Sequence, residues 1–330
     1  MKESSLPKFP VAWQPLVAQA ANGLRQLALD EEAKARFCYD PGLRPYMQRV
    51  AKRYVAGETI PDLLRRIEQI NARGHAGSAE YMGESCRDEG KALAETAIFL
   101  ELIAAIDRQN LRCSISLDLS HVGSVIDAEL GFQNIKRIAI AAAAVGREVM
   151  ISMEGSDRAD NIYATYGRLH TEAGLSNVGI TVPAKLHRTA QDLPALMAYP
   201  GRIRLVKGAF LEAENIAYSR DSPELAACYR RYAKALLTSG HQCSIATHDG
   251  QIQEELSAFI SSEDIRRDRY EFESLIGLGT DLLDSLQKRG FTTREYAVFG
   301  EEYFLYVLNR IAEEPVRLYQ ALIDVMEVSS

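Results

Sequence analysis

CSISLDL at residues 113–119 and EVMISM at residues 148–153 are short β-prone runs, and the helical stretch FQNIKRIAIAAAAVG at residues 132–146 lies between them. This strand–helix–strand order recurs along the chain. Five further β-prone runs lie at residues 178–182, 203–206, 243–247, 270–275 and 295–298, and SAEYM at residues 78–82 is a weaker eighth candidate. Strands that alternate with helices indicate a parallel sheet covered by helices.

The number of strands decides between two parallel folds. Eight would close a (β/α)8 barrel, whereas six would fit an open doubly wound sheet. A dinucleotide-binding open sheet carries GxGxxG after an early strand, and GLGTD at residues 277–281 falls too late and has the wrong spacing. We therefore predict an α/β fold: a TIM-like (β/α)8 catalytic barrel over residues 76–330, with a helical N-terminal segment over residues 1–75 that packs on it.

Composition narrows the class of protein. The net charge of −7 argues against nucleic-acid binding, which relies on a basic face. No apolar run approaches the roughly 20 residues that span a bilayer, and the first residues lack the pattern of a signal peptide. The five cysteines form no CxxC pair, and the six histidines form no HxH or HExxH motif. We expect a cytoplasmic protein without disulfides or a metal site.

Polar residues follow or occupy the predicted strands, and chemistry in a barrel collects at the carboxyl ends of the strands. The candidates are Glu84, Asp118, Ser120, His121, Ser152, Glu154, Pro183, Lys185, Arg204, Lys207, Thr247, His248, Asp249, Glu271, Glu273 and Tyr296. Any one of these side chains can lie at a strand end only because it is exposed to solvent there, without a role in function. Arg204 differs because it lies inside IRLV, where an unpaired buried charge is costly. A partner or an anionic ligand is therefore expected for Arg204.

Three segments carry a resemblance to a known family. RLVKGAF at residues 204–210, IATHD at residues 245–249 and REYAVFGEEYFLYVLNRIAEEP at residues 294–315 resemble, in the same order, motifs of the flavin-dependent proline dehydrogenase family. YEFESLIGLG at residues 270–279 is similar to a further motif, and the match runs from about Glu84 to Pro315. The last segment reads as a strand, a turn at Gly300 and a helix. Side chains four apart share a helix face, so Tyr306 and Arg310 can point at one ligand.

The resemblance implies a barrel that holds FAD against the strand ends and oxidises a C–N bond by hydride transfer to flavin N5. By position, Arg204 would approach N5, where a cation favours the reduced flavin, and Tyr306 would pack over the substrate ring. The resemblance places the cofactor against Arg204, Val206, Lys207, Gly208, Ala209, Thr247, His248 and Glu313. It gives as catalytic or substrate-contacting candidates Arg204, Tyr306, Arg310, Asp118, Asn309 and Tyr296.

The sequence departs from the family where the substrate carboxylate is held. The family uses a strand lysine and two adjacent arginines, but Asp118 stands at the lysine position and Asn309–Arg310 replaces the arginine pair. In addition, Ser152, Pro183 and Tyr303 stand where the family has aspartate, glutamine and tryptophan. Each lost charge-assisted hydrogen bond is worth roughly 1.5–3 kcal/mol, so binding of free proline would weaken by about 3–6 kcal/mol.

We therefore predict an oxidoreductase of amino-acid metabolism that acts on CH–NH groups, with a modified or non-proline substrate. An amine or guanidinium would suit Asp118, as would a proline masked as an amide or a carrier thioester. Two alternatives remain: an ordinary L-proline dehydrogenase that forms 1-pyrroline-5-carboxylate, and a catalytically degenerate flavin-binding or scaffold barrel. A sugar-phosphate barrel without flavin lacks the expected glycine-rich late loop. The electron acceptor and the oligomeric state stay open.

Overall fold

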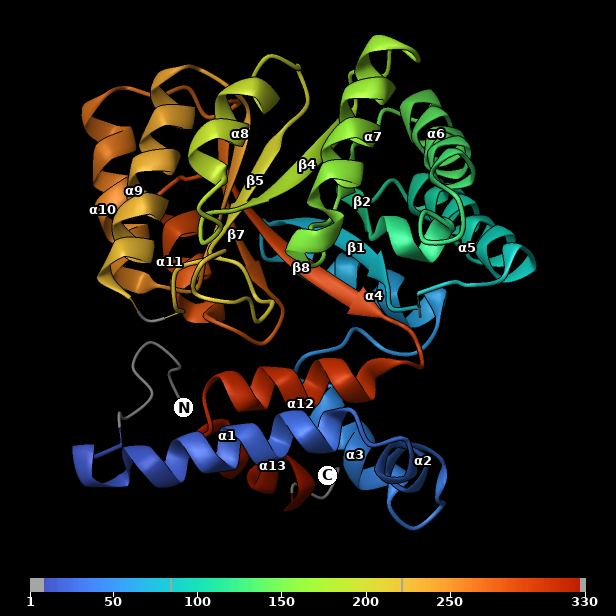
Figure 1. The fold of residues 1–330 in the computed structure, drawn as a ribbon, viewed down its shortest axis with the longest axis vertical. Coiled ribbons are helices and arrows are strands. Elements are labelled where there is room, and N and C mark those ends of the chain that lie inside the picture. The colour runs from blue at the N-terminus through green and yellow to red at the C-terminus, as the bar shows by residue number, and fades with distance from the viewer. Residues whose placement is uncertain (1–8, 84, 221, 327–330) are drawn as a thin grey trace.

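The computed structural model describes residues 9–83, 85–220 and 222–326, and its centre is a closed barrel of eight parallel strands in sequence order (Figure 1). The strands are β1 (Ala76–Tyr81), β2 (Cys113–Leu117), β3 (Val149–Ile151), β4 (Val178–Pro183), β5 (Ile203–Val206), β6 (Cys243–Ala246), β7 (Tyr270–Leu275) and β8 (Thr293–Phe299). β1 pairs with β8 from Ala76–Arg294 to Tyr81–Phe299 and so closes the barrel. The predicted (β/α)8 fold is confirmed, including the weak first strand.

Helices cover the outside of the barrel. They are α4 (Ile60–Ala72), α5 (Glu89–Arg108), α6 (Ala128–Ala144), α7 (Ala159–Thr171), α8 (Thr189–Leu196), α9 (Pro223–Thr238), α10 (Gly250–Ser262) and α11 (Thr280–Lys288), with the short η3 (Leu119–Val122) and η4 (Ser156–Arg158) in the loops. Side-chain caps start several of them; the carboxylate of Asp88 accepts from Lys91 N and that of Asp127 from Leu130 N. Fully buried side chains such as Phe99 and Phe272 fill the space between sheet and helices.

A separate helical layer lies against one end of the barrel (Figure 1). It contains η2 (Val11–Trp13), α1 (Gln14–Ala28), α2 (Glu31–Tyr39), α3 (Arg44–Ala51), α12 (Tyr303–Glu313) and α13 (Arg317–Met326). Segments far apart in the sequence meet here: α1 packs along α12, and Arg53 Nε donates to Asp324 Oδ2 at 2.8 Å. Phe304 and Val307 of α12 are buried in the core of this layer.

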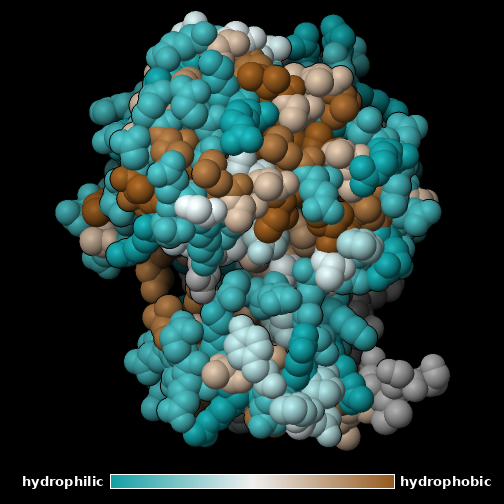
Figure 2. Space-filling view, turned by 90° about the vertical axis from the view of Figure 1, so that its right-hand side faces the viewer, coloured by the Kyte–Doolittle hydropathy of each residue, from teal (hydrophilic) through white to brown (hydrophobic). Residues whose placement is uncertain are grey.

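The position of α4 bears on how the chain divides. α4 packs against β1 and β8, whereas α1 to α3 pack with one another and with α12 and α13. A boundary at residue 75 therefore stays a prediction. Among the residues that the structure describes, no helix is long and apolar enough to cross a membrane. Figure 2 shows apolar residues gathered over the barrel on one face and mostly hydrophilic residues over the helical layer.

Candidate active site

α12 lies across the end of the barrel at which the strands finish, because the chain turns sharply after β8 (Figure 1). Gly300 makes this turn with a φ of +132°, and a Cβ there would lie 2.8 Å from Met82 O. Its N–H donates to Gly57 O at 3.0 Å, which fixes the turn. Only glycine adopts this conformation so close to another backbone without strain. The carboxyl ends of the strands therefore face Tyr306 and Arg310 of α12.

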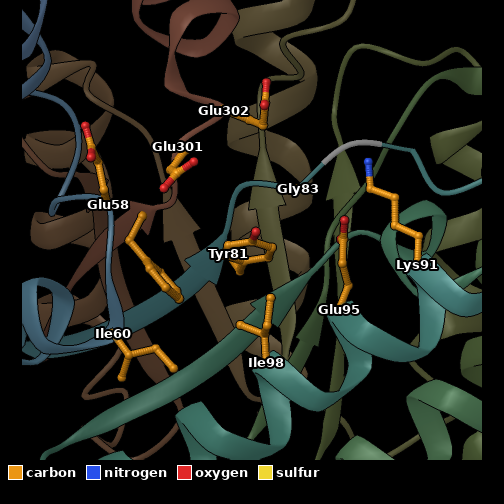
Figure 3. Close-up of a pocket in the computed structure, with 10 residues that line it drawn as sticks. Glu58, Ile60, Tyr81, Gly83, Lys91, Glu95, Ile98, Glu301 and Glu302 are labelled. Carbon is orange, nitrogen blue, oxygen red and sulfur yellow. The ribbon is translucent and has the colours of Figure 1, made fainter. Parts of the chain in front are cut away.

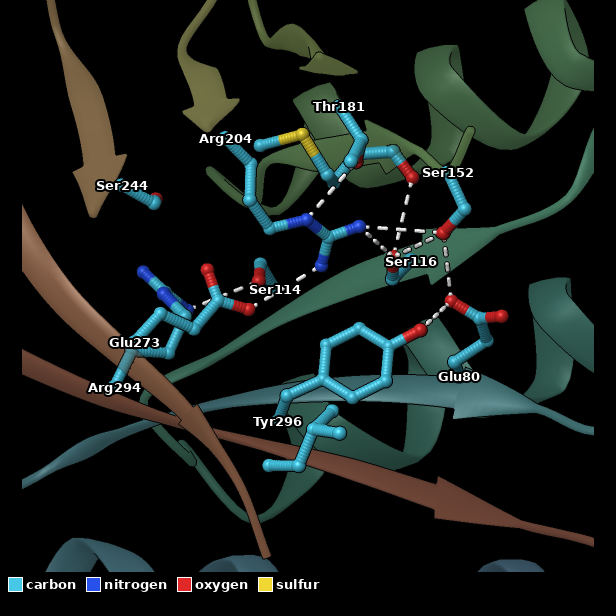
Figure 4. A network of polar contacts seen from close by, with 12 residues as sticks. Glu80, Ser114, Ser116, Ser152, Thr181, Arg204, Ser244, Glu273, Arg294 and Tyr296 are labelled. Carbon is cyan, nitrogen blue, oxygen red and sulfur yellow. Dashed lines mark hydrogen bonds and ion pairs between the residues drawn. The ribbon is translucent and has the colours of Figure 1, made fainter. Parts of the chain in front are cut away.

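Arg204 on β5 points into the barrel, where it is 4% exposed and nearly all of its donors are engaged (Figure 4). Its Nη1 lies 3.2 Å from Glu273 Oε1 and its Nε donates to Thr181 Oγ1 at 2.9 Å. Nη2 donates to Ser116 Oγ at 2.8 Å and to Ser152 Oγ at 3.2 Å. Burial is the largest influence and opposes the charge, but Glu273, Tyr296 and Glu80 together outweigh it and raise the pKa of Arg204. The partner that the sequence predicted for Arg204 is Glu273.

A second buried ion pair lies deeper in the barrel. Arg294 Nε donates to Glu271 Oε1 at 2.8 Å, and Arg294 Nη1 donates to Ser114 Oγ at 2.9 Å. Burial alone would raise the pKa of Glu271, but Arg294 and Arg202 lower it to about 2. The prediction that Glu271 and Glu273 lie at the carboxyl end of their strand is wrong. They point into the barrel because they occupy alternate positions near the start and the middle of β7.

Glu80 on β1 joins this network to Tyr296, and the sequence reading missed it (Figure 4). Its carboxylate accepts from the hydroxyl of Tyr296 and from Ser152 Oγ, the latter at 2.8 Å. The ring of Tyr296 lies 4.9 Å from the guanidinium carbon of Arg204. Burial and then Glu80 raise the pKa of Tyr296 well above its usual value. The alternation of SAEYM was the only signal for Glu80, since it puts Glu80 and Ser78 on one face.

Asp118 follows β2 at the mouth of the barrel, and two further carboxylates lie near it. Its side chain is 25% exposed, and its Oδ2 lies 3.9 Å from His121 Nε2. Burial raises the pKa of Asp118 well above its usual range, and the charges of Glu80 and Glu154 add to this, while Arg204 and Arg158 oppose it. Glu154 is paired with Arg158. We call Glu80, Asp118 and Glu154 the acidic side of the mouth.

α12 places Tyr306 and Arg310 together, as their spacing predicted. The guanidinium carbon of Arg310 lies 5.3 Å from the Tyr306 ring centroid, and Arg310 Nη2 lies 2.6 Å from Glu313 Oε1. Arg310 Nε is buried without a hydrogen-bond partner among the described residues. Burial raises the pKa of Tyr306 to about 12. Asn309 is half-buried beside Arg310, whereas Tyr303 is buried in the core of the helical layer.

The predicted cofactor residues lie in the loops after β5 and β6. Lys207 Nζ lies 2.9 Å from Asp249 Oδ2. Leu275 N donates to His248 Nε2 at 3.1 Å, which leaves Nδ1 of the neutral ring as a donor. Burial lowers the pKa of His248 to about 3, so the ring is neutral at physiological pH. Thr247 is buried, and its Oγ1 accepts from Asp249 N at 3.2 Å.

The loop after β5 also brings backbone close to a neighbouring strand. Gly208 has a φ of +110°, and a Cβ there would lie 2.6 Å from Lys185 Cδ. Val206, Lys207 and Gly208 are half-buried, and Ala209 is exposed. Lys185 Nζ donates to Phe210 O at 2.6 Å. Arg220, from the same long loop, lies 3.3 Å from Glu313, its Nη1 facing Oε1.

The loops after β4 and β5, together with α12, form the basic side of the mouth, which we define as Lys185, Lys207, Arg220 and Arg310. Its cations outnumber the nearby carboxylates Asp249, Glu212 and Glu313. A surplus of cations, the Nδ1–H donor of His248 and an Arg310 N–H without a partner in the described part of the chain suit a phosphate-bearing cofactor and a carboxylate. The residues present therefore fit the flavin dinucleotide that the resemblance implies.

A separate cavity of about 350 Å³ lies beside the outer surface of β1, between α4 and α5 (Figure 3). Its lining includes Glu58, Tyr81, Lys91 and Glu95, and none of the predicted catalytic or cofactor residues. The predicted site is therefore distinct from this cavity. Glu84, which the sequence named at the first strand end, lies outside the described residues.

Fold and site together define a (β/α)8-barrel enzyme with its chemistry at the carboxyl ends of the strands. The chain belongs to the proline dehydrogenase family, since the family model described as Proline dehydrogenase matches residues 63–314. The family prediction is confirmed, and the chain is an oxidoreductase that acts on CH–NH groups. FAD is the usual cofactor of this family.

Two curated relatives agree with this assignment. The proline dehydrogenase of Deinococcus radiodurans is 31% identical over 275 residues, which cover 82% of this chain and 88% of that protein. Proline dehydrogenase 1 of Bacillus subtilis is 28% identical over 265 residues, which cover 80% of this chain and 87% of that protein.

Solved structures support the fold. Proline utilization A (PutA) from Bdellovibrio bacteriovorus, inactivated by N-propargylglycine, superposes with a TM-score of 0.79 at 16% identity over 100% of this chain. PutA from Bradyrhizobium japonicum, a D778Y mutant, superposes with a TM-score of 0.70 at 17% identity. The chain spans 43% and 42% of those two proteins, so the comparison concerns this barrel and its helical layer alone.

Proposed function

We propose that this protein is an FAD-dependent dehydrogenase of an amino-acid-like secondary amine. The substrate carboxylate is bound at Arg310, and its nitrogen faces Asp118 and Glu80. The observation that carries the proposal is the division of the mouth: a buried Arg310 N–H without a partner among the described residues lies on one side, and Glu80, Asp118 and Glu154 lie on the other. An amino acid carries an anion and a cation that match these two sides.

Lys207, Thr247, His248 and the backbone at Gly208 would hold the cofactor. When bound, FAD supplies an acceptor for the hydride that leaves the substrate carbon. The neutral ring of His248 offers an Nδ1–H donor because its Nε2 already accepts from Leu275 N. Lys207 brings a positive charge on a half-exposed side chain. Arg204, held by Glu273 and Thr181, keeps a fixed positive charge under the mouth, which favours negative charge that develops above it.

Two kinds of substrate are considered, and the choice between them depends on how strongly Asp118 and Asn309 weaken the binding of a free carboxylate. The first is a modified or non-proline amino acid, because two of three cations that the family uses for a free carboxylate are absent. In this reading the substrate carries an additional amine or guanidinium, or its carboxylate is masked as an amide or a carrier thioester. The second is L-proline itself, oxidised to 1-pyrroline-5-carboxylate, and the names of the curated relatives favour it.

The visible spectrum of the purified protein tests both readings. We expect a yellow protein whose flavin band bleaches under anaerobic conditions when a suitable secondary amine is added. Bleaching by L-proline at micromolar to low millimolar concentration would establish the second reading. A flavin that L-proline leaves oxidised but that proline amides or diamino acids reduce would establish the first. A protein that binds FAD and oxidises none of these amines would be a degenerate barrel, and one that does not bind FAD would overturn the proposal.

A further inference from the structure

Asp118 differs from every other carboxylate around the mouth in what surrounds it. Glu273 is paired with Arg204, Glu154 with Arg158, and Glu313 with Arg310. Glu80 accepts hydrogen bonds from Ser152 and Tyr296. By contrast, among the residues that the structure describes, no donor lies within hydrogen-bond distance of the Asp118 carboxylate, and His121 lies 3.9 Å away. Asp118 thus keeps free lone pairs at the mouth.

The chemistry of amine oxidation creates a use for such a group. A secondary amine reaches the protein as an ammonium ion at neutral pH, and its nitrogen lone pair is tied up by the extra proton. A hydride leaves the neighbouring carbon readily only when this lone pair is free to form the C=N bond. A base in the site must therefore take one proton from nitrogen before oxidation.

We propose, on the basis of the function proposed above, that Asp118 is the base that takes this proton from the substrate ammonium. The N–H bond breaks, its electron pair stays on nitrogen, and the proton ends on a carboxylate oxygen of Asp118. Charge is conserved, since an ammonium and a carboxylate become a neutral amine and a neutral acid. No oxidant takes part in this step.

The other groups at the mouth are less suited to accept the proton. Tyr296 and Tyr306 hold their own protons, because burial raises the pKa of each hydroxyl. The ring of His121 is buried behind Asp118, and its Nδ1 has no partner in the described part of the chain. Burial lowers the pKa of His121, so the ring is neutral and is a weak acceptor for the substrate proton.

Among the residues that the structure describes, the charged groups that act on Asp118 set its strength as a base. Glu80 from β1 and Glu154 after β3 make its carboxylate a stronger proton acceptor, and Arg204 from β5 and Arg158 from η4 limit that effect. Tyr296 from β8 bonds to Glu80 and is itself affected by the charge of Asp118. His121 from η3 is a further titratable neighbour, with its Nε2 3.9 Å from Asp118 Oδ2. Since burial and the two glutamates raise the pKa of Asp118, the basic form appears as the pH rises through that raised value.

The test is the pH profile of flavin reduction by the amine that the wild-type protein oxidises fastest, measured anaerobically by stopped flow for wild type and Asp118→Asn. General-base catalysis contributes about 10²–10⁴-fold. We expect Asp118→Asn to reduce flavin at least about 100-fold more slowly at pH 7. Only the free amine in solution can then react, so the rate of the variant should rise about tenfold per pH unit up to the amine's own pKa. Asp157→Asn, an exposed carboxylate in the neighbouring loop, should behave as wild type.

The outcomes separate this inference from the function on which it rests. If no amine reduces the wild-type flavin, the proposed function fails and this inference with it. If an amine does so and Asp118→Asn keeps the wild-type pH profile, or falls by one factor at every pH, only the role of Asp118 is refuted. Glu80→Gln gives an independent measurement should Asp118→Asn lose its flavin. Removal of that negative charge should move the acidic limb of the profile to lower pH, and an unmoved limb would count against the proposal.

Discussion

The two sides of the barrel mouth are built from different strand ends and loops and carry opposite charge. On the side of β1 to β3 the side chains are Glu80, Asp118 and Glu154, and on the side of β4, β5 and α12 they are Lys185, Lys207, Arg220 and Arg310. Arg204 lies beneath both and is paired with Glu273. The comparison shows that one end of a single barrel can bind an anionic group and a cationic group of its ligands a short distance apart.

The opposite charge of the two sides also explains why the site can still bind an amino acid, although Asp118 and Asn309 stand where the family has cations. A pocket with three cations binds a carboxylate strongly and repels an ammonium. Exchange of one cation for Asp118 lowers the affinity for the carboxylate and adds an attraction for the nitrogen. The four changes below break or sharpen the contrast between the two sides.

The largest effect on stability is expected at Arg204, which lies beneath both sides of the mouth. Arg204→Met leaves Glu273 buried without its cation, and breaking a buried pair in this way costs about 3–5 kcal/mol of unfolding free energy. Chemical denaturation measures the loss. Arg204→Met combined with Glu273→Met should recover most of it, while Arg230→Met, which removes a surface pair with Glu255, should cost less than about 1 kcal/mol. Equal losses for the buried and the surface variant would contradict this account.

Arg310 tests the basic side. Arg310→Gln should raise the KM of a carboxylate-bearing substrate about 10–100-fold, because a charge-assisted hydrogen bond is worth roughly 1.5–3 kcal/mol. Asn309→Arg should act in the opposite direction on free L-proline. Steady-state kinetics under saturating electron acceptor measures both. Leu305→Ala, on the exposed face of the same helix, is the matched control. An unchanged KM in Arg310→Gln would place the carboxylate elsewhere.

His248, in the loop after β6, should make the unfolding free energy depend on pH. Burial depresses its pKa to about 3 in the folded protein, so the unfolded chain takes up a proton below about pH 6.5 that the folded chain refuses. This contribution to stability is complete above that pH and is lost as the pH falls toward 3, at up to about 1.4 kcal/mol per pH unit. Urea unfolding of wild type and His248→Asn at pH 7 and pH 5 measures it. The variant should show the shallower dependence, and identical slopes would refute the prediction.

The smallest effect is expected at Lys207. Its ion pair with Asp249 is about one-third exposed, so Lys207→Met should hardly change stability. We expect its affinity for FAD to fall about fivefold, roughly 1 kcal/mol, through loss of one charged donor. Titration of the apoprotein with FAD measures this, with Lys288→Met on exposed α11 surface as control. An effect of the same size in both variants would show that general surface charge, and not this side of the mouth, is responsible.

The sequence predicted the strands well and the barrel interior badly, for one physical reason. β-prone runs between helical stretches are local features, and all eight correspond to strands. Which face of a strand points inward depends on register and closure, which no local run records. Glu271 and Glu273 were therefore expected at the mouth, and Arg294 and Glu80 were overlooked.

The helices also differ in how much of their arrangement can be predicted from local sequence. The four-residue spacing of Tyr306 and Arg310 placed them together correctly, because helical geometry is local. α2 lies within the segment that was predicted to be helical, but EEAKARFCY alone gives a weak helical signal because it is short and strongly charged and only Cys38 is buried. It begins at an Asp30 cap and is tied to the distant Glu302 by Lys34. Tertiary contacts such as this pair leave no pattern in the nearby sequence.

The helical layer has a consequence for the order of events on the ribosome. α1 to α3 are synthesised before the barrel, but α12, which α1 packs along, follows roughly 250 residues later than α3. At about 5–20 residues per second the first helices wait for some tens of seconds without their partner. Their apolar side chains therefore need protection by a chaperone or by transient contacts during that interval. The barrel mouth is likewise uncovered until α12 has been made, because this helix lies across the carboxyl ends of the strands.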